Sequence, residues 1–275
     1  MQSEALSPWR LRIEHHGFSH LELDTEAGRI HFMPGPDWLL LECSPDEQLH
    51  TVILLWCWSE MLSATAEAIS LGHRLRVIAP APILEWLRPI GSFEGVSSFN
   101  HAAAEPGGAR VDVDLIPYLP MPERTSMESL RLARSVLRNP FRALRRRMIK
   151  RGFPICEPMC AELTFPSGAR LVHLNLACHS STSARWWSDM VKRCTEAEWI
   201  IVGCDYEHAD AVERLLADLK GTQILLTDLV GDYRRRAGLP VRLLTPLVDR
   251  LTNSGHKCFV FATKASYRYD RIALL

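Results

Sequence analysis

The sequence lacks several features that would place it in a familiar functional class. Basic and acidic residues are equal in number, 32 of each in 275 residues, so no net charge favours nucleic acid or a membrane surface as a partner. No apolar run is long enough to span a bilayer, and the N-terminal residues hold no apolar core of a signal peptide. We therefore expect a cytoplasmic globular protein without a transmembrane segment.

The eight cysteines include no C-x-x-C pair, and several lie in apolar runs, a pattern typical of free thiols in a reducing compartment. Cys156 and Cys160 are followed by Cys178 and His179, but this spacing departs from that of zinc-binding cysteine motifs. Adjacent residues rarely face each other, so Cys178 and His179 make a poor pair of nucleophile and base. We expect no zinc site at these residues.

Acidic residues are absent from residues 129–156, where nine basic residues fall. Apolar residues recur there at helical spacing, and Asn139-Pro140 is typical of an N-cap followed by proline, so we predict two helices over residues 121–152. An arginine stripe lies opposite their apolar face: Arg131, Arg134, Arg138, Arg142 and Arg145. Either these arginines pair with acids elsewhere, or the helices of residues 131–151 bind an anionic partner such as phospholipid headgroups, an acidic protein or nucleic acid. The case for nucleic acid is weak, because only Phe141 adds an aromatic ring.

The rest of the chain alternates between strand and helix patterns. Period-two alternation opens the chain, and near-continuous apolar runs follow that suit strands buried on both faces. The predicted strands are residues 10–16, 19–25, 29–34, 38–43, 50–56, 74–80, 92–100, 108–120, 159–165, 170–177, 198–204, 223–229 and 257–262. The predicted helices outside the basic segment are residues 63–70, 82–90, 183–196, 207–221 and 240–255. This order indicates two sheets with helices on their outer faces.

The chain resembles the metallo-β-lactamase fold superfamily over nearly its whole length. It is most similar to the branch of ascorbate-phosphate lactonase and N-acyl phosphatidylethanolamine phospholipase D-like hydrolases. Gly17 to Leu23 stands where that branch carries G-H-x-S-x-L, and Met33-Pro34 stands where it carries D-P. The family's H-x-H-x-D-H, between a buried strand and a helix, reads Trp56-Cys57-Trp58-Ser59-Glu60-Met61 here. The resemblance implies an α/β fold, a four-layer αββα sandwich, as one domain over residues 1–275 with the basic helices of residues 121–152 inserted.

The same resemblance implies that the family's metal ligands are missing. The family's middle histidine is expected near Tyr118, but no histidine lies there. Its metal-bridging aspartate is expected after the strand of residues 170–177, but residues 165–188 contain no aspartate. Asp228 stands where the last metal-binding histidine is expected. An indole N–H donates a hydrogen bond but offers no lone pair to a metal, and methionine is a weak ligand. We therefore expect no bound metal and no cofactor at the degenerate positions Trp56, Trp58, Glu60, Met61 and Asp228.

Individual residues near these positions have ordinary structural explanations. Trp56 and Trp58 are expected to fill the core rather than stack on a ligand. Glu60 either caps or pairs with a base at the helix N-terminus, which we prefer, or remains as a general base. Four histidines lie on adjacent early strands and could cluster, although such residues are more often hydrogen-bonded than metal ligands: His15, His16, His20 and His31.

Three functions follow. The one we favour is a non-catalytic binding or assembly protein whose partner is an active relative or a second copy of the chain. The second is a hydrolase-like enzyme that uses the same cleft without zinc, with Glu60, Asp205, His179 and Asp228 as candidate catalytic residues. The third is binding of an anionic surface through the basic helices. A filled cleft would argue against the enzyme, and the salt dependence of anion binding tests the third function.

Overall fold

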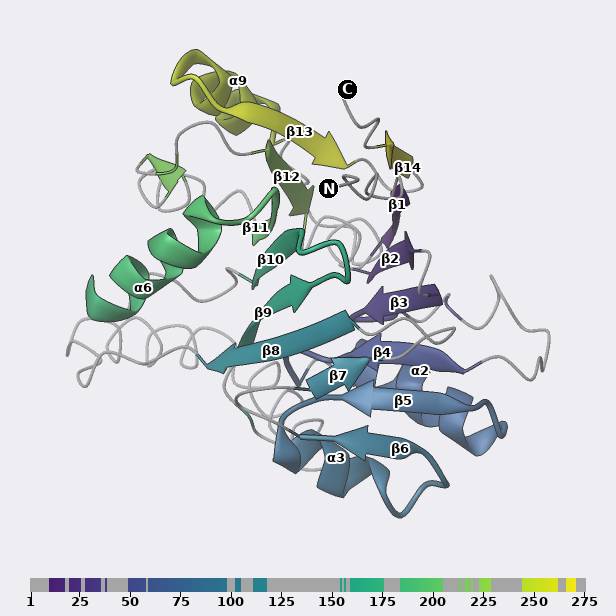
Figure 1. Cartoon of the computed structure of the whole chain (residues 1–275). Coiled ribbons are helices and arrows are strands. Elements are labelled where there is room, and N and C mark those ends of the chain that lie inside the picture. The colour runs from purple at the N-terminus through teal and green to yellow at the C-terminus, as the bar shows by residue number, and fades with distance from the viewer. Residues whose placement is uncertain are drawn as a thin grey trace, which may run out of the picture.

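Two seven-stranded β-sheets pack face to face in the computed structural model of the protein (Figure 1). The structure describes residues 10–17, 20–25, 28–35, 38, 49–57, 59–97, 102–104, 111–117, 154, 156, 159–175, 184–204, 213, 216–217, 219, 223–228, 244–261 and 266–270.

The first sheet has the strand order β14-β1-β2-β3-β4-β5-β6. Its strands are β1 (Arg10–Gly17), β2 (His20–Thr25), β3 (Gly28–Phe32), β4 (His50–Ile53), β5 (Leu75–Ile78), β6 (Glu94–Val96) and β14 (Ser266–Asp270). β14, β1, β2 and β3 are antiparallel neighbours, whereas β3 to β6 are parallel. The pairing of β1 with β14 joins segments from the two ends of the chain.

The second sheet has the order β13-β12-β11-β10-β9-β8-β7. Its strands are β7 (Ala102–Ala104), β8 (Val111–Pro117), β9 (Met159–Thr164), β10 (Arg170–Asn175), β11 (Trp199–Cys204), β12 (Gln223–Asp228) and β13 (Lys257–Phe261). β7 to β10 are antiparallel and β10 to β13 are parallel. The carboxyl ends of β10 to β13 therefore lie at one edge of the sandwich.

Three separate apolar cores show that the fold has four layers. The central core lies between the sheets and takes alternate residues from each, such as Leu21 and Leu23 of β2 and Leu171 of β10. A second core fills the space between the first sheet and helices α2 (Ser59–Ser70) and α3 (Ala81–Leu87). A third lies between the second sheet and helices α6 (Ala184–Thr195) and α9 (Thr245–Asn253), so helices cover both outer faces (Figure 1). The predicted αββα arrangement is confirmed.

Several local predictions were wrong, and β7 (Ala102–Ala104) lies outside every predicted strand. α2 begins at Ser59 rather than Ser63, because the buried helix face already starts at Met61 and Ser63 lies exposed within the helix. Trp38, predicted to begin a strand, is helical and packs into the core under α2 and α3. β14 was not predicted, although Ser266–Asp270 alternates serine, tyrosine and charged residues. None of the helices in the described part of the chain is long and apolar enough to cross a membrane.

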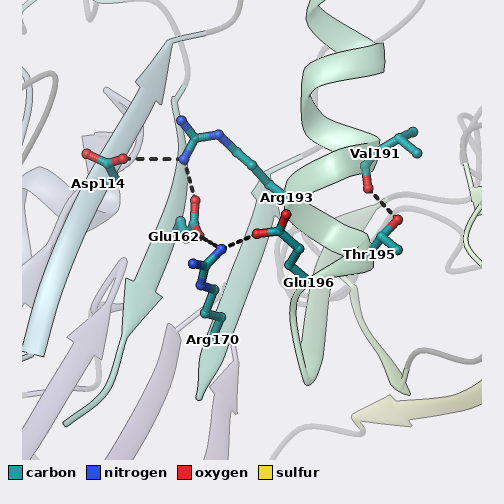
Figure 2. A network of polar contacts seen from close by, with 7 residues as sticks. All are labelled: Asp114, Glu162, Arg170, Val191, Arg193, Thr195 and Glu196. Atoms are coloured by element: carbon teal, nitrogen blue, oxygen red, sulfur yellow. Dashed lines mark hydrogen bonds and ion pairs between the residues drawn. The ribbon is translucent and has the colours of Figure 1, made fainter. Parts of the chain in front are cut away.

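A network of charges fixes α6 on the second sheet (Figure 2). Glu162 of β9 is buried and pairs with Arg193 of α6 and, at 3.7 Å, with Arg170 of β10. Arg193 also donates to Asp114 of β8 at 3.3 Å, and Arg170 pairs with Glu196 just after α6. Each acid thus has a basic partner, so the network is explained as a structural tie between helix and sheet.

Candidate functional site

The segment that stands in place of the family's metal-binding motif, residues 56–61, connects β4 to α2. Leu55 lies in the central core, and Trp56 is half-buried against that core. Met61, in the first turns of α2, is 1% exposed and belongs to the same core. These residues face the space between the two sheets, where the resemblance places metal ligands.

Met33, just after β3, supports this segment through its sulfur. Its φ of 48° is a left-handed conformation that is uncommon for a residue other than glycine, so contacts must hold it in place. Its backbone N–H donates to the Ile53 carbonyl at 2.9 Å, and its sulfur accepts the backbone N–H of Leu55 at 3.0 Å. Methionine thus accepts a hydrogen bond at the position where the resemblance expects an aspartate.

Two further contacts join this segment to the start of β9 in the second sheet. The N–H of Met159 donates to the carbonyl of Leu55 at 2.8 Å. The N–H of Cys156 donates to the sulfur of Cys57 at 3.1 Å. The end of β4 therefore has its polar backbone groups bonded to neighbours on both sides.

The described residues at this site do not fit zinc. The indole of Trp56 has no lone pair to give, and the thioether of Met61 is buried among apolar side chains. The sulfur of Met33 already accepts the Leu55 N–H. Within the ranges given above, the structure holds no group of three or more histidine, cysteine, aspartate or glutamate side chains arranged to bind a metal ion. Zinc chemistry therefore has no donor set in the described part of this site.

His173 of β10 lies against Phe32 of β3, on the opposite sheet. It is 1% exposed, and its ring stacks on Phe32 of β3 with centroids 5.1 Å apart and an interplanar angle of 12°. Neither ring nitrogen has a hydrogen-bond partner, and burial lowers the pKa of His173 to about 4. A neutral imidazole sealed against a phenyl ring serves here as a core side chain rather than as a base open to substrate.

Other residues predicted for the site are only partly described. Glu60 lies in α2 and Asp228 ends β12 opposite Cys204, but both side chains lie outside the described residues. The residues Trp58, His179, Asp205, Arg131, Arg134, Arg138, Arg142 and Arg145 also lie outside them. Cys156 and Cys160 pack into different layers, under α2 and α3 and under α6 respectively, so they do not form a common site.

A histidine cluster lies on the other, helix-covered face of the first sheet. His31 is fully buried, with its Nδ1 3.4 Å from His20 Nε2 and its Nε2 3.3 Å from His50 Nδ1. Glu22 lies 4.0 Å from His31 and 3.6 Å from Arg29. The predicted clustering thus holds for His20 and His31, whereas the side chains of His15 and His16 are not described. His50 was missed, although it opens the next strand at a position on the same face.

Each neutral imidazole offers one N–H and one acceptor nitrogen, so the three rings can form a hydrogen-bonded series in either direction. The ring of Trp38 covers His31 with centroids 5.2 Å apart. Through Trp38 the cluster adjoins the core beneath α2 and α3, and the sheet separates it from the residues around Trp56.

Comparison with known proteins identifies the fold. No protein-family model and no curated protein matches the sequence. Solved structures do match: Igni18, a metallo hydrolase from the archaeon Ignicoccus hospitalis, has a TM-score of 0.59 and 11% identity and covers 94% of this chain and 98% of its own. A protein from Parabacteroides distasonis described as a metal-dependent hydrolase has a TM-score of 0.55 and 10% identity, covering 92% and 93%. Unliganded yeast PDE1 has a TM-score of 0.52 and 8% identity, covering 93% and 98%. With two sheets between helical layers, the chain has the fold of the metallo-β-lactamase superfamily.

Proposed function

We propose that this protein is a non-catalytic binding or assembly protein built on a metallo-hydrolase fold. The observation that carries the proposal is the chemistry at the end of β4. Trp56 packs against the central core and Met61 lies inside it, at positions that the resemblance assigns to metal ligands. Neither side chain directs a lone pair into a cleft, so neither can hold a metal ion that activates water. Both residues instead stabilise the fold.

The contacts around Trp56 support this proposal further. A ligand site for a metal needs polar atoms that are held in place but free to coordinate. Here the sulfur of Met33 accepts the N–H of Leu55, and the sulfur of Cys57 accepts the N–H of Cys156. Both sulfurs accept backbone N–H groups, which favours a packed junction over a metal-binding one.

The direct test is metal content. The purified chain should contain well under one equivalent of zinc, iron or manganese by elemental analysis, also after incubation with each metal and gel filtration. A metal that binds the folded state raises stability, so a chelator lowers the melting temperature only of a protein that holds a metal. We therefore expect the same melting temperature with and without chelator. About one metal per chain together with a lower melting temperature in chelator would overturn the proposal.

The edge strand β13 offers a surface through which a second copy of the chain could bind. β13 pairs only with β12 among the described strands, and its adjacent residues Phe259 and Val260 are 44% and 43% exposed. Neighbouring residues of a strand point to opposite faces, so this edge shows apolar side chains on both faces. An edge of this kind is suited to pairing with another strand.

Sedimentation of the wild type and of two variants tests this surface. Val260→Asp places a charge on the edge and should shift a dimer to monomer. Leu71→Asp, at a residue 61% exposed in the turn after α2, is the matched control and should leave the mass unchanged. A wild-type monomer at all concentrations, or equal effects of both variants, would count against self-association through β13.

A further inference from the structure

Cys57 and Cys156 lie together at the junction between the two sheets, although 99 positions separate them in the chain. Cys57 follows β4 of the first sheet, and Cys156 precedes β9 of the second. Both are half-buried free thiols that pack against the core beneath α2 and α3. Their position is therefore fixed by the same packing that holds the candidate site.

The distances suit a disulfide. The sulfur of Cys57 is 3.1 Å from the backbone nitrogen of Cys156. Because the N–Cα bond is about 1.46 Å long, that sulfur lies no more than about 4.6 Å from the Cα atom of Cys156. This is short enough for the two Cα atoms to reach the range of about 4.4–6.8 Å found in disulfides. A rotation of the Cys156 side chain can then bring the two sulfurs together.

The surroundings of Cys57 favour its thiolate. Hydrogen bonding from the Cys156 side chain lowers the pKa of Cys57, with a further contribution from the Cys156 backbone, against an opposing effect of burial. A thiolate is the reactive form of cysteine, so we assign Cys57 as the attacking residue of the pair. Elsewhere the reverse holds: burial raises the pKa of Cys258, also half-buried, to about 11.

We propose that Cys57 and Cys156 form a redox-active pair that hydrogen peroxide oxidises to a disulfide linking the two sheets. The Cys57 thiolate attacks one peroxide oxygen; an S–O bond forms, the O–O bond breaks, and hydroxide leaves and takes up a proton to give the first water. The resulting sulfenic acid is attacked by the Cys156 sulfur, which gives up its proton. The S–S bond forms, the S–O bond breaks, and the departing hydroxide takes up that proton to give the second water, so two thiols are oxidised as one hydrogen peroxide is reduced to two waters.

The disulfide would close a loop of about 100 residues beside the Leu55–Met159 hydrogen bond and would hold the chain on either side of Trp56. Closing a long loop restricts the unfolded chain, so the oxidised protein should melt at a higher temperature. We expect a rise on the order of 5–10 °C that a dithiol reductant reverses. This site is independent of the proposed binding function, since it requires neither a partner nor an inactive cleft.

The experiment uses the full chain, reduced and then treated with hydrogen peroxide near stoichiometric amounts. Free thiols are blocked with maleimide, and a tryptic digest is analysed by mass spectrometry. Cys57 shares its tryptic peptide with Cys43, and Cys156 shares its own with Cys160. Fragmentation, or a background of Cys43→Ser and Cys160→Ala, assigns the bond. We expect two thiols to be lost and one peptide that joins Cys57 to Cys156.

Single variants define the roles. In Cys156→Ser, Cys57 should accumulate as a sulfenic acid that a cyclic dione labels; in Cys57→Ser, that label and the disulfide should both be absent. Cys258→Ser is the control and should oxidise like the wild type. The absence of the joined peptide from the wild type, or dione labelling of Cys258 as strong as that of Cys57, would overturn the proposal. Peptide mapping of the wild type gives this answer even if a variant folds poorly.

Discussion

His173 should make the stability of the protein depend on pH between neutral and mildly acidic conditions. Its ring is 1% exposed, stacks on Phe32 and has no hydrogen-bond partner for either nitrogen. Burial lowers its pKa from 6.5 to about 4. In the unfolded chain the imidazole is solvated and keeps a pKa of about 6.5. Between these two values the unfolded state binds more protons than the folded state does.

The sign and size of the effect follow from this difference. The contribution is fully present above pH 6.5 and is lost as the pH falls toward 4, because protons then favour the unfolded chain. A difference of about 2.5 pH units corresponds to roughly 3 kcal/mol, of which about 2 kcal/mol is lost by pH 5. That is a large part of the total stability of an ordinary domain, about 5–15 kcal/mol.

Urea unfolding of the wild type and of His173→Leu at pH 7.5, 6.5, 5.5 and 5.0 measures the effect. Leucine removes the titration and both unpaired nitrogens, so at pH 7.5 the variant should be at least as stable as the wild type. At pH 5 it should be more stable by about a further 2 kcal/mol. Both proteins retain the cluster of His20, His31 and His50, so any contribution of the cluster is the same in both.

His73→Gln is the control for the loss of a histidine at a partly exposed position, in the turn after α2. It should leave the shape of the stability curve unchanged. Parallel curves for the wild type and His173→Leu would refute the assignment of acid sensitivity to His173.

Three other predictions concern the core, the charges and the basic helices. Glu162→Ala should lower the free energy of unfolding by about 1–2 kcal/mol, measured in urea, because two partly exposed guanidinium groups then lose one carboxylate but each keeps another. Met61→His should lower the free energy of unfolding by about 2–4 kcal/mol in the same assay, because Met61 is buried. The triple variant that adds Trp56→His and Trp58→His should show no zinc-dependent hydrolysis. The last variant replaces four arginines of the stripe by glutamate: Arg134, Arg138, Arg142 and Arg145. If the stripe faces solvent, each replacement should change the free energy of unfolding by about 0.5 kcal/mol or less, and the protein should bind anionic vesicles more weakly. A large fall in melting temperature with unchanged vesicle binding would show that the arginines pair within the fold.

The fold could be predicted because period-two alternation is a local signal. In β2, Leu21 and Leu23 face the central core while His20 and Glu22 lie on the opposite face of the sheet, as the alternation requires. The start of α2 could not be predicted in the same way, because a serine can cap a helix or lie on its exposed face. In the structure Met61 is already helical and buried, so Ser63 lies on the exposed face of the helix and does not cap it. The helix begins at Ser59, four residues before Ser63.

The site was less predictable because its contacts join distant parts of the chain. The sulfur of Met33 accepts a hydrogen bond from Leu55, 22 positions away, and Cys57 meets Cys156 across 99 positions. No spacing in the sequence encodes such a meeting. The histidine cluster lies between these extremes: His20 and His31 were placed on adjacent strands, but the approach of His50 depends on the parallel pairing of β3 with β4.

The contacts around Trp56 join the two sheets of this metallo-hydrolase-type fold through sulfur, backbone and ring atoms. A metal that takes ligands from both halves of a fold stabilises it, because the ion binds the folded state and not the unfolded chain. In this protein, three contacts cross between the sheets at the same place: the Leu55–Met159 hydrogen bond, the Cys57–Cys156 contact and the stacking of Phe32 on His173. These contacts need only sulfur, backbone and ring atoms. Each contact works through packing or a hydrogen bond that is already made, so none of them requires an open cleft. Under the proposed function, the junction would hold the two sheets together while a different surface binds the partner.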